Sequence, residues 1–377
     1  MMRKLIALRT LPWLVLAALT TVPAQAAGNK VVIGDIDDMS GLYADVIGPG
    51  GVEAAKMAIE DFGGSVLGNK IELLTSDHQN KPDVGAQKFR EWADRDGVTM
   101  ILGGSNTGVS LAMNNVAKEK KIPFIAIGAA GASLTGKDCT PYTVHYVYDT
   151  TSLANGTAKT MVAQGGKTWF FLTADYAFGT QLQEAATKVV EASGGKVLGL
   201  ANAGNDFTNS IKAADEFGIG KTMKPAALLA FISDIHSLGL KTAQGLYLTT
   251  GWYWDLNDKT RAFGKRFYEK TKREPTMNQA GYYSATLTYL NAVKAAGTTD
   301  SDKVMAQLKS MKIDDMFTSN GKIRADGLME HEMYIMQVKK PEESKAPWDY
   351  YKLVQTMSGE EAFGKLSESA CPLVTTH

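Results

Sequence analysis

The chain has 377 residues, with 40 lysines and arginines against 40 aspartates and glutamates, so its formal net charge is zero. This balance offers no basic field for nucleic acid or for an anionic membrane, and we expect neither as a partner. A chain of this length is longer than a single hydrophobic core usually serves, which favours two domains.

The first 26 residues have the pattern of a secretory signal peptide. Cations at Arg3, Lys4 and Arg9 flank or precede an apolar run over residues 11–19, and a small-residue cleavage site follows. The run is too short for a membrane-spanning anchor. The predicted cleavage leaves Ala27 first, where a lipid-anchored protein would have cysteine. We therefore expect an exported mature chain of 351 residues without a lipid anchor, with 37 cations, 40 acidic residues and a net charge of −3.

The chain contains two cysteines, Cys139 and Cys371. An isolated pair in an exported protein favours a disulfide over two free thiols. The bridge would close a loop of more than 200 residues. In the chain-entropy model such a loop stabilises the fold by at most roughly 5 kcal/mol.

Predicted strands and helices alternate along the mature chain. The apolar runs predict strands at residues 31–34, 70–74, 100–102, 123–127, 169–173, 196–201, 226–232, 246–249 and 333–338. Helical periodicity predicts helices near residues 52–62, 83–96, 108–121, 150–164, 180–193, 207–217, 258–271, 280–296 and 301–311. This alternation is typical of an α/β fold with parallel sheets. One alternation ends near residue 149, and the helical block at 258–311 has no strand of its own. We predict one lobe from residues 27–148 and 256–331, and a second from 149–255 and 332–377.

Two neighbouring predicted strands end in loops rich in small residues. The first strand runs into Gly103-Gly104, and Ser105-Asn106-Thr107 then supplies N-cap chemistry for the next helix. The second ends in the loop at residues 128–131, which contains Ala129 and Ala130. In open α/β sheets ligands sit at these carboxyl ends. Neither loop carries a base, a nucleophile or a metal ligand, so the loops predict binding and not catalysis.

No motif for a cofactor, a metal or a catalytic group is complete. The turn at residues 48–51 has Glu53 where a dinucleotide fingerprint needs glycine, and Gly220-Lys221-Thr222 ends a predicted helix instead of starting one. The five histidines are scattered, and the G-x-S-x-G pattern of a nucleophile elbow is absent from the sequence. We expect no catalytic residue, metal or cofactor. A secreted α/β hydrolase remains the alternative from another functional class.

The order of several segments resembles one protein family. These segments are DMSGLYAD, ILGGSNTG, IPFIAIGAAGASLTG, DYAFG, ISDIHSLG, TTGWYWDLND and ACPL. In this order and spacing they resemble the type I periplasmic solute-binding proteins of the leucine/isoleucine/valine branch, which serve ABC importers. The resemblance implies two Rossmann-like lobes joined by three crossovers, with a small-molecule ligand held in the cleft by hinge closure. It further implies a monomer in the periplasm that delivers its ligand to a membrane permease.

The resemblance also assigns roles within the cleft. The carboxylate-binding loop falls on Ser105 to Thr107, and Ala130 occupies the place of a threonine found in amino-acid binders. The acid that takes the ligand's ammonium falls near Ser233 or Asp234. The candidate ligand-binding residues are Tyr43, Ser105, Asn106, Thr107, Ala129, Ala130, Tyr176, Phe178, Asn202, Gly204, Asp234, Tyr253 and Tyr282. Which aromatic residue of the run 252–254 faces the cleft stays open.

This chain departs from the family in the second lobe, which lacks roughly 25 residues before Ala201. We expect this lobe to be one strand and one helix short.

The ligand prediction follows from charge. An unpaired ammonium in a closed cleft costs several kcal/mol, whereas burying an aromatic ring of about 150 Å² contributes roughly 4 kcal/mol. The sequence therefore favours a hydrophobic or aromatic carboxylate without an α-amine. Leucine, isoleucine and valine are the alternative ligands.

Overall fold

The computed structural model describes residues 31–203 and 207–374, and for residues 199–203 the backbone alone. The first lobe is built on a six-stranded sheet in the order β2-β3-β1-β4-β5-β6, parallel except for β2. Its strands are β1 (Val31–Asp37), β2 (Ser65–Val66), β3 (Asn69–Asp77), β4 (Met100–Gly103), β5 (Phe124–Ala126) and β6 (Thr143–His145). Every residue of β1 is buried, as expected for a central parallel strand covered on both faces.

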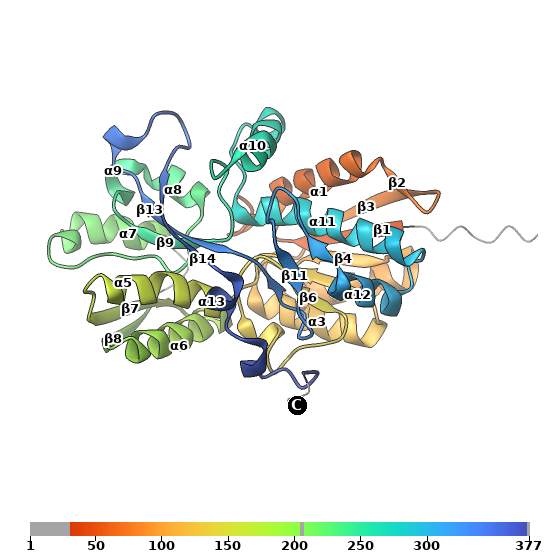
Figure 1. Cartoon of the computed structure of the whole chain (residues 1–377), viewed down its shortest axis with the longest axis horizontal. Helices are drawn as coiled ribbons and strands as arrows, with labels where there is room; N and C mark the ends of the chain where they lie inside the picture. The colour runs from red at the N-terminus through yellow and green to blue at the C-terminus, as the bar shows by residue number, and fades with distance from the viewer. Residues whose placement is uncertain (1–30, 204–206, 375–377) are drawn as a thin grey trace, which may run out of the picture.

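Helices cover both faces of this sheet. Those of the first 148 residues are α1 (Gly48–Phe62), α2 (Pro82–Glu91) with the π-turn η1 (Trp92–Asp96), α3 (Thr107–Lys120) and the 3₁₀ turn η2 (Ala132–Leu134). The later helical block supplies α10 (Asp258–Thr271), α11 (Met277–Ala296) and α12 (Ser301–Ser310). α1 packs against α11 and α2 against α3, and Figure 1 places α1 and α11 on one side of the sheet and α3 on the other. The predicted return of this block to the first lobe agrees with that packing.

A small antiparallel sheet follows α12. Its strands are β10 (Lys312–Ile313), β11 (Gly321–Ile323) and β12 (Met329–Glu330). A single bridge between His145 and Leu328 attaches this region to the end of β6. The chain passes between lobes three times: between β6 and residue 150, between β9 and α10, and between β12 and β13.

The second lobe begins at the helix predicted for residues 150–164, which the structure divides into three parts. These parts are α4 (Thr150–Leu153), the π-turn η3 (Ala154–Ala158) and α5 (Lys159–Ala163). The other elements of the second lobe are β7 (Thr168–Ala174), α6 (Ala177–Ala192), β8 (Lys196–Ala203), α7 (Phe207–Glu216), η4 (Ile219–Lys221), α8 (Ile232–Leu238), α9 (Leu240–Ala243), β9 (Tyr247–Thr250), β13 (Met333–Val338), η5 (Pro341–Glu343), β14 (Tyr351–Met357), α13 (Gly359–Phe363) and η6 (Leu366–Glu368).

The strands of the second lobe form two separate sheets. β7 and β8 make a parallel pair, whereas β9, β13 and β14 form an antiparallel sheet in the order β14-β13-β9. The predicted strand at residues 226–232 is wrong: the segment makes one bridge, Ala226 to Tyr247, and α8 begins at Ile232. No strand among the described residues joins β8 to β9, which agrees with the expected shortening of this lobe. One face of the β7-β8 pair consequently exposes Phe170, Leu172 and Leu198.

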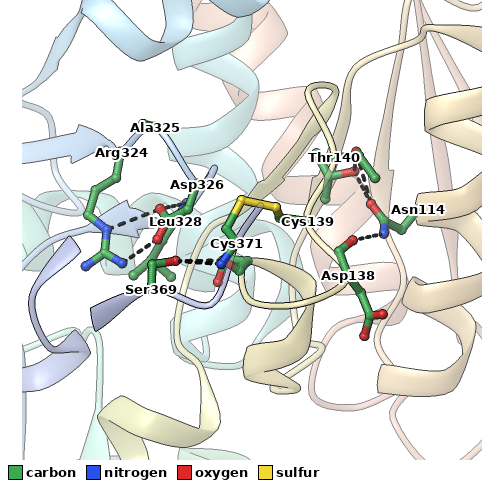
Figure 2. The surroundings of a disulfide bond; sticks show 12 residues. Asn114, Asp138, Cys139, Thr140, Arg324, Ala325, Asp326, Leu328, Ser369 and Cys371 are labelled. Carbon is green, nitrogen blue, oxygen red and sulfur yellow. Dashed lines mark hydrogen bonds and ion pairs between the residues drawn. A yellow bond between two sulfur atoms is a disulfide. The ribbon is translucent and has the colours of Figure 1, made fainter. Parts of the chain in front are cut away.

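The predicted disulfide is confirmed and ties the C-terminal tail to the first lobe (Figure 2). Cys139 and Cys371 are bonded, with 5.6 Å between their Cα atoms. The Ser369 hydroxyl donates to the Thr135 carbonyl oxygen at 3.3 Å. The Arg324 guanidinium is paired with Asp326 and also donates to the Gly364 carbonyl oxygen at 2.9 Å. The tail therefore runs from the second lobe back onto the loop that follows β5.

Candidate functional site

A pocket lies between the lobes, at the carboxyl ends of β1, β4, β5 and β7. It encloses about 340 Å³, including its opening to solvent. The lining residues are Tyr43, Val46, Ile47, Ser105, Asn106, Thr107, Gly128, Ala130, Tyr148, Tyr176, Phe178, Leu229, Phe231 and Asn278. Seven of the thirteen predicted ligand-binding residues are in this set: Tyr43, Ser105, Asn106, Thr107, Ala130, Tyr176 and Phe178.

The loop before α3 is held rigidly by its own polar groups. The Asn106 side chain caps the helix, because its Oδ1 accepts the backbone N–H groups of Gly108 at 2.7 Å and Val109 at 3.4 Å. The Thr107 hydroxyl oxygen accepts the N–H of Gly131 at 3.1 Å and so joins this loop to the one after β5. Thr107 is the first residue of α3, so its own N–H has no intrahelical partner. The helix start thus offers an anion both N–H donors and the positive end of a helix dipole.

A buried acid beneath this loop fixes its position. Oδ1 of Asp37 accepts the backbone N–H groups of Asp38 at 2.9 Å and Ser105 at 3.1 Å, and its Oδ2 accepts the hydroxyl of Tyr282. The Ser105 hydroxyl lies 3.2 Å from Nε2 of His78. All of these side chains are buried. Tyr282, which was predicted to contact ligand, lies outside the pocket lining and supports Asp37 from α11.

Asp35 extends this network away from the pocket. Its Oδ1 accepts the Tyr282 hydroxyl at 3.1 Å, and its Oδ2 has no partner among the described residues. Burial, together with the nearby charge of Asp37, raises the pKa of Asp35 well above its ordinary value. Asp35 is therefore the carboxyl of the pair that stays protonated, which lets two acids share a dry site.

The loop after β5 presents the methyl group of Ala130 and its own backbone to the pocket. Gly128 has φ +94°, which favours glycine, and a Cβ there would meet Ile47 at 2.7 Å. Ala130 lines the pocket, whereas Ala129 lies outside its lining and is buried. Its carbonyl oxygen lies 2.6 Å from Nε2 of His145. His145 therefore holds the loop from the end of β6.

We expect His145→Gln to reduce the pH dependence of stability. Burial lowers the pKa of His145 to about 4, whereas an unfolded histidine titrates near 6.5. Its contribution is therefore present above pH 6.5 and lost as the pH falls through 4, and it amounts to about 3 kcal/mol. A glutamine amide keeps a donor for Ala129 but cannot titrate. Urea unfolding at pH 7 and pH 4.5 should show a smaller difference in the variant; an unchanged difference would refute this account of His145.

The wall from the second lobe is apolar and aromatic. The rings of Tyr176 and Phe178 lie 5.9 Å apart at the end of β7, and Leu229 and Phe231 continue the surface. The Tyr176 hydroxyl is hydrogen-bonded to that of Tyr43, which belongs to the first lobe. Burial raises the pKa of both tyrosines, so both hydroxyls stay protonated and can bond. This contact joins the two lobes over the pocket.

Sequence reasoning missed several lining residues. Phe231 and Leu229 replace the expected acid, because they precede α8 by one and three residues and face the pocket. Asn278 was also missed; it follows the Thr276 cap of α11 and is 1% exposed. Its Nδ2 donates to the Tyr148 hydroxyl at 3.5 Å, and its Oδ1 has no hydrogen-bond partner in the part of the chain that the structure describes. A polar residue two positions before the predicted helix at 280–296 was the available signal.

Four further candidates lie elsewhere or cannot be placed. Asp234 lies outside the pocket lining, and its carboxylate accepts the backbone N–H of Phe231 at 2.9 Å, which caps α8. Tyr253 lies outside the lining of this pocket and packs in the core of the second lobe, where its hydroxyl donates to the Trp348 carbonyl oxygen at 3.2 Å. The backbone of Asn202 pairs with Thr173, but its side chain and all of Gly204 lie outside the described residues.

Comparison with known structures points to one fold and one family. A periplasmic binding protein from Burkholderia mallei has 54% identity and a TM-score of 0.90, covering 92% of this chain and 100% of its own. A branched chain amino acid ABC transporter periplasmic ligand-binding protein from Burkholderia xenovorans LB400 has 40% identity, coverage of 91% and 100%, and a TM-score of 0.85. A solute binding protein of an ABC transporter from Rhodopseudomonas palustris BisB5, at 21% identity, covers 88% and 98% with a TM-score of 0.79 and shares the fold.

Sequence comparison agrees with the structural one. Leu/Ile/Val-binding protein homolog 6 of Brucella suis is 23% identical over 233 residues, which are 60% of this chain and 57% of that relative. The chain thus spans little more than half the length of this curated relative. The family model described as periplasmic binding protein matches residues 30–201 and 196–345, and the two matches meet at β8, where the second lobe is short. The chain has the type I fold and belongs to the periplasmic binding protein family.

Proposed function

We propose that this protein is the periplasmic solute-binding component of an ABC importer and that it captures a small aromatic or hydrophobic carboxylate in the pocket between its lobes. One observation carries the choice of ligand. The pocket sets a capped helix start, with Asn106 and Thr107, against an apolar wall that contains Phe231 where an acid was expected. The ligand's carboxylate lies on the helix start, and its ring lies on the wall.

The carboxylate needs no cation here. The Asn106 amide and the Thr107 N–H are hydrogen-bond donors at the positive end of the α3 dipole. Binding of a ligand ammonium group would be less favourable, because Asp234 caps α8 from outside the pocket lining. A buried ammonium without a charged partner costs several kcal/mol. Rings packed on Tyr176 and Phe178 add the aromatic contacts that favour such a ligand.

A branched-chain amino acid is the second candidate ligand. The buried Oδ1 of Asn278 is an acceptor without a partner among the described residues, and it suits an ammonium or a hydroxyl donor. The Burkholderia xenovorans relative, which is described as a branched chain amino acid ABC transporter protein, also supports this second candidate ligand. The fold also accommodates aromatic acids, because the Rhodopseudomonas palustris protein is in complex with 3,4-dihydroxy benzoic acid.

Closure of the lobes would signal occupancy to the importer. The hydroxyls of Tyr43 and Tyr176 meet across the cleft, so a closed state has an interaction that an open state loses. The closed monomer docks on the membrane permease, which receives the ligand unchanged, since the protein binds without catalysis. Among the described residues no helix is long and apolar enough to cross a membrane.

A melting-temperature screen tests this proposal. Benzoate- and phenylpropanoid-type acids should raise the melting temperature of the mature protein more than leucine, isoleucine or valine does. Asp234→Asn should leave this shift nearly unchanged, because no ammonium depends on that charge. A leucine shift that is larger than the aromatic one, and that Asp234→Asn abolishes, would restore the amino-acid interpretation.

A further inference from the structure

A second pocket lies next to the first in the same cleft. It encloses about 220 Å³ and is lined from the second lobe by Phe231, Thr250 and Tyr351 and from the start of α11 by Met277, among others. Phe231 lines both pockets, and Met277 of the second is followed directly by Asn278 of the first. The two pockets therefore adjoin at Phe231.

The second pocket contains a buried polar atom that protein groups leave without a partner. Tyr351 is 5% exposed, and among the described residues its hydroxyl makes no hydrogen bond. The neighbouring Tyr253 hydroxyl, by contrast, donates to the Trp348 carbonyl oxygen at 3.2 Å. A buried hydroxyl without a partner is unfavourable, so its persistence calls for a ligand group or a water molecule.

The charge around Tyr351 limits what that group can be. Burial raises the pKa of Tyr351 well above its usual value, as do Asp234 and Tyr253. The hydroxyl therefore stays protonated and can donate as well as accept. The carboxylate of Asp234 makes this end of the cleft unfavourable for a second anion. A neutral hydroxyl, which can both donate and accept, fits the hydroxyl of Tyr351, which has no partner among the described residues.

We infer that the second pocket is a subsite for a neutral hydroxyl at the far end of the ligand, and that Tyr351 recognises it. The ligand is then an aromatic carboxylate hydroxylated at the end opposite its carboxylate, with the ring passing beside Phe231. This inference rests on the proposed function, because the carboxylate end is taken to lie on Asn106 and Thr107.

Two matched pairs of acids test the subsite: benzoate with 4-hydroxybenzoate, and cinnamate with 4-hydroxycinnamate. Each is titrated calorimetrically into the mature wild type, Tyr351→Phe and Tyr350→Phe. In the wild type the hydroxyl should improve affinity by about 3- to 10-fold in at least one pair, the worth of one hydrogen bond. Tyr351→Phe should remove that advantage and leave the acid without the hydroxyl unaffected. Tyr350→Phe is the control and should keep the preference, since Tyr350 lies outside both pocket linings and its hydroxyl is bonded to His236.

The outcomes separate this inference from the proposed function. If benzoate or cinnamate binds but the hydroxyl improves neither pair, or if Tyr351→Phe keeps the preference, the subsite is wrong and the proposed function stands. If Tyr351→Phe raises the melting temperature with no change in the affinity ratio, the hydroxyl binds only water and the subsite is again wrong. If no aromatic acid binds while leucine does, both the subsite and the proposed ligand fail.

Discussion

The Asn106→Asp variant should fold normally and lose at least about 30-fold in affinity for a carboxylate ligand. Aspartate caps a helix as well as asparagine does and suits the α3 dipole, so Gly108 and Val109 keep their acceptor. The change removes the amide donor and places a negative charge beside the ligand's own. An interface charge left without a partner costs about 2–5 kcal/mol, which corresponds to roughly 30- to several-thousand-fold in affinity.

Asn106→Ser is the matched control for this variant. Serine also caps a helix but carries no charge, so this variant should lose only the contribution of one hydrogen bond, about 3- to 10-fold. Calorimetric titration and thermal unfolding of the three proteins separate binding from stability. Equal affinity in Asn106→Asp and the wild type would show that the carboxylate does not lie on this helix start.

Replacing both cysteines by serine should lower the free energy of unfolding by about 2–5 kcal/mol. The bridge between Cys139 and Cys371 links positions 232 residues apart in the sequence, so its loss greatly increases the freedom of the unfolded chain. It also releases the tail that donates from Ser369 to Thr135. Denaturant unfolding of the variant measures the loss.

Reductant provides the control for the disulfide. Added to the wild type, it should reproduce the lower stability of the variant, and it should have no effect on the variant itself. Mass spectrometry of non-reduced peptides should find one cross-linked pair. Equal stability of the two proteins would contradict a stabilising role for the bridge.

The first lobe could be predicted from sequence because its signals are local. The strand at residues 123–127 is wholly apolar, and Asn106 stands at the N-cap position that its side chain occupies in the structure. The place of Tyr282 could not be predicted, because α11 is buried around nearly its whole circumference. Helical position therefore does not reveal which of its side chains reach the pocket. The strand expected at residues 226–232 failed because an apolar run gives no information on whether a neighbouring strand exists to pair with it.

The ligand wall of the second lobe illustrates a second limit. Asp234 and Phe231 are three residues apart around the start of α8, and the sequence favoured the acid for its charge. In the structure the carboxylate turns back to the N–H of Phe231, and the ring lines the pocket instead. Short polar side chains near helix starts compete for backbone N–H groups, and this competition depends on side-chain direction that sequence spacing does not give.

Calorimetric titration of the mature protein with phenylpropanoate and with leucine tests the central claim most directly. The proposed site predicts one-to-one binding of the aromatic acid, with at least tenfold lower affinity for leucine, because a charged ammonium has no carboxylate partner in the pocket lining. Recovery of the acid unchanged after denaturation would support binding without catalysis. Tight leucine binding with no heat from the aromatic acid would contradict the claim.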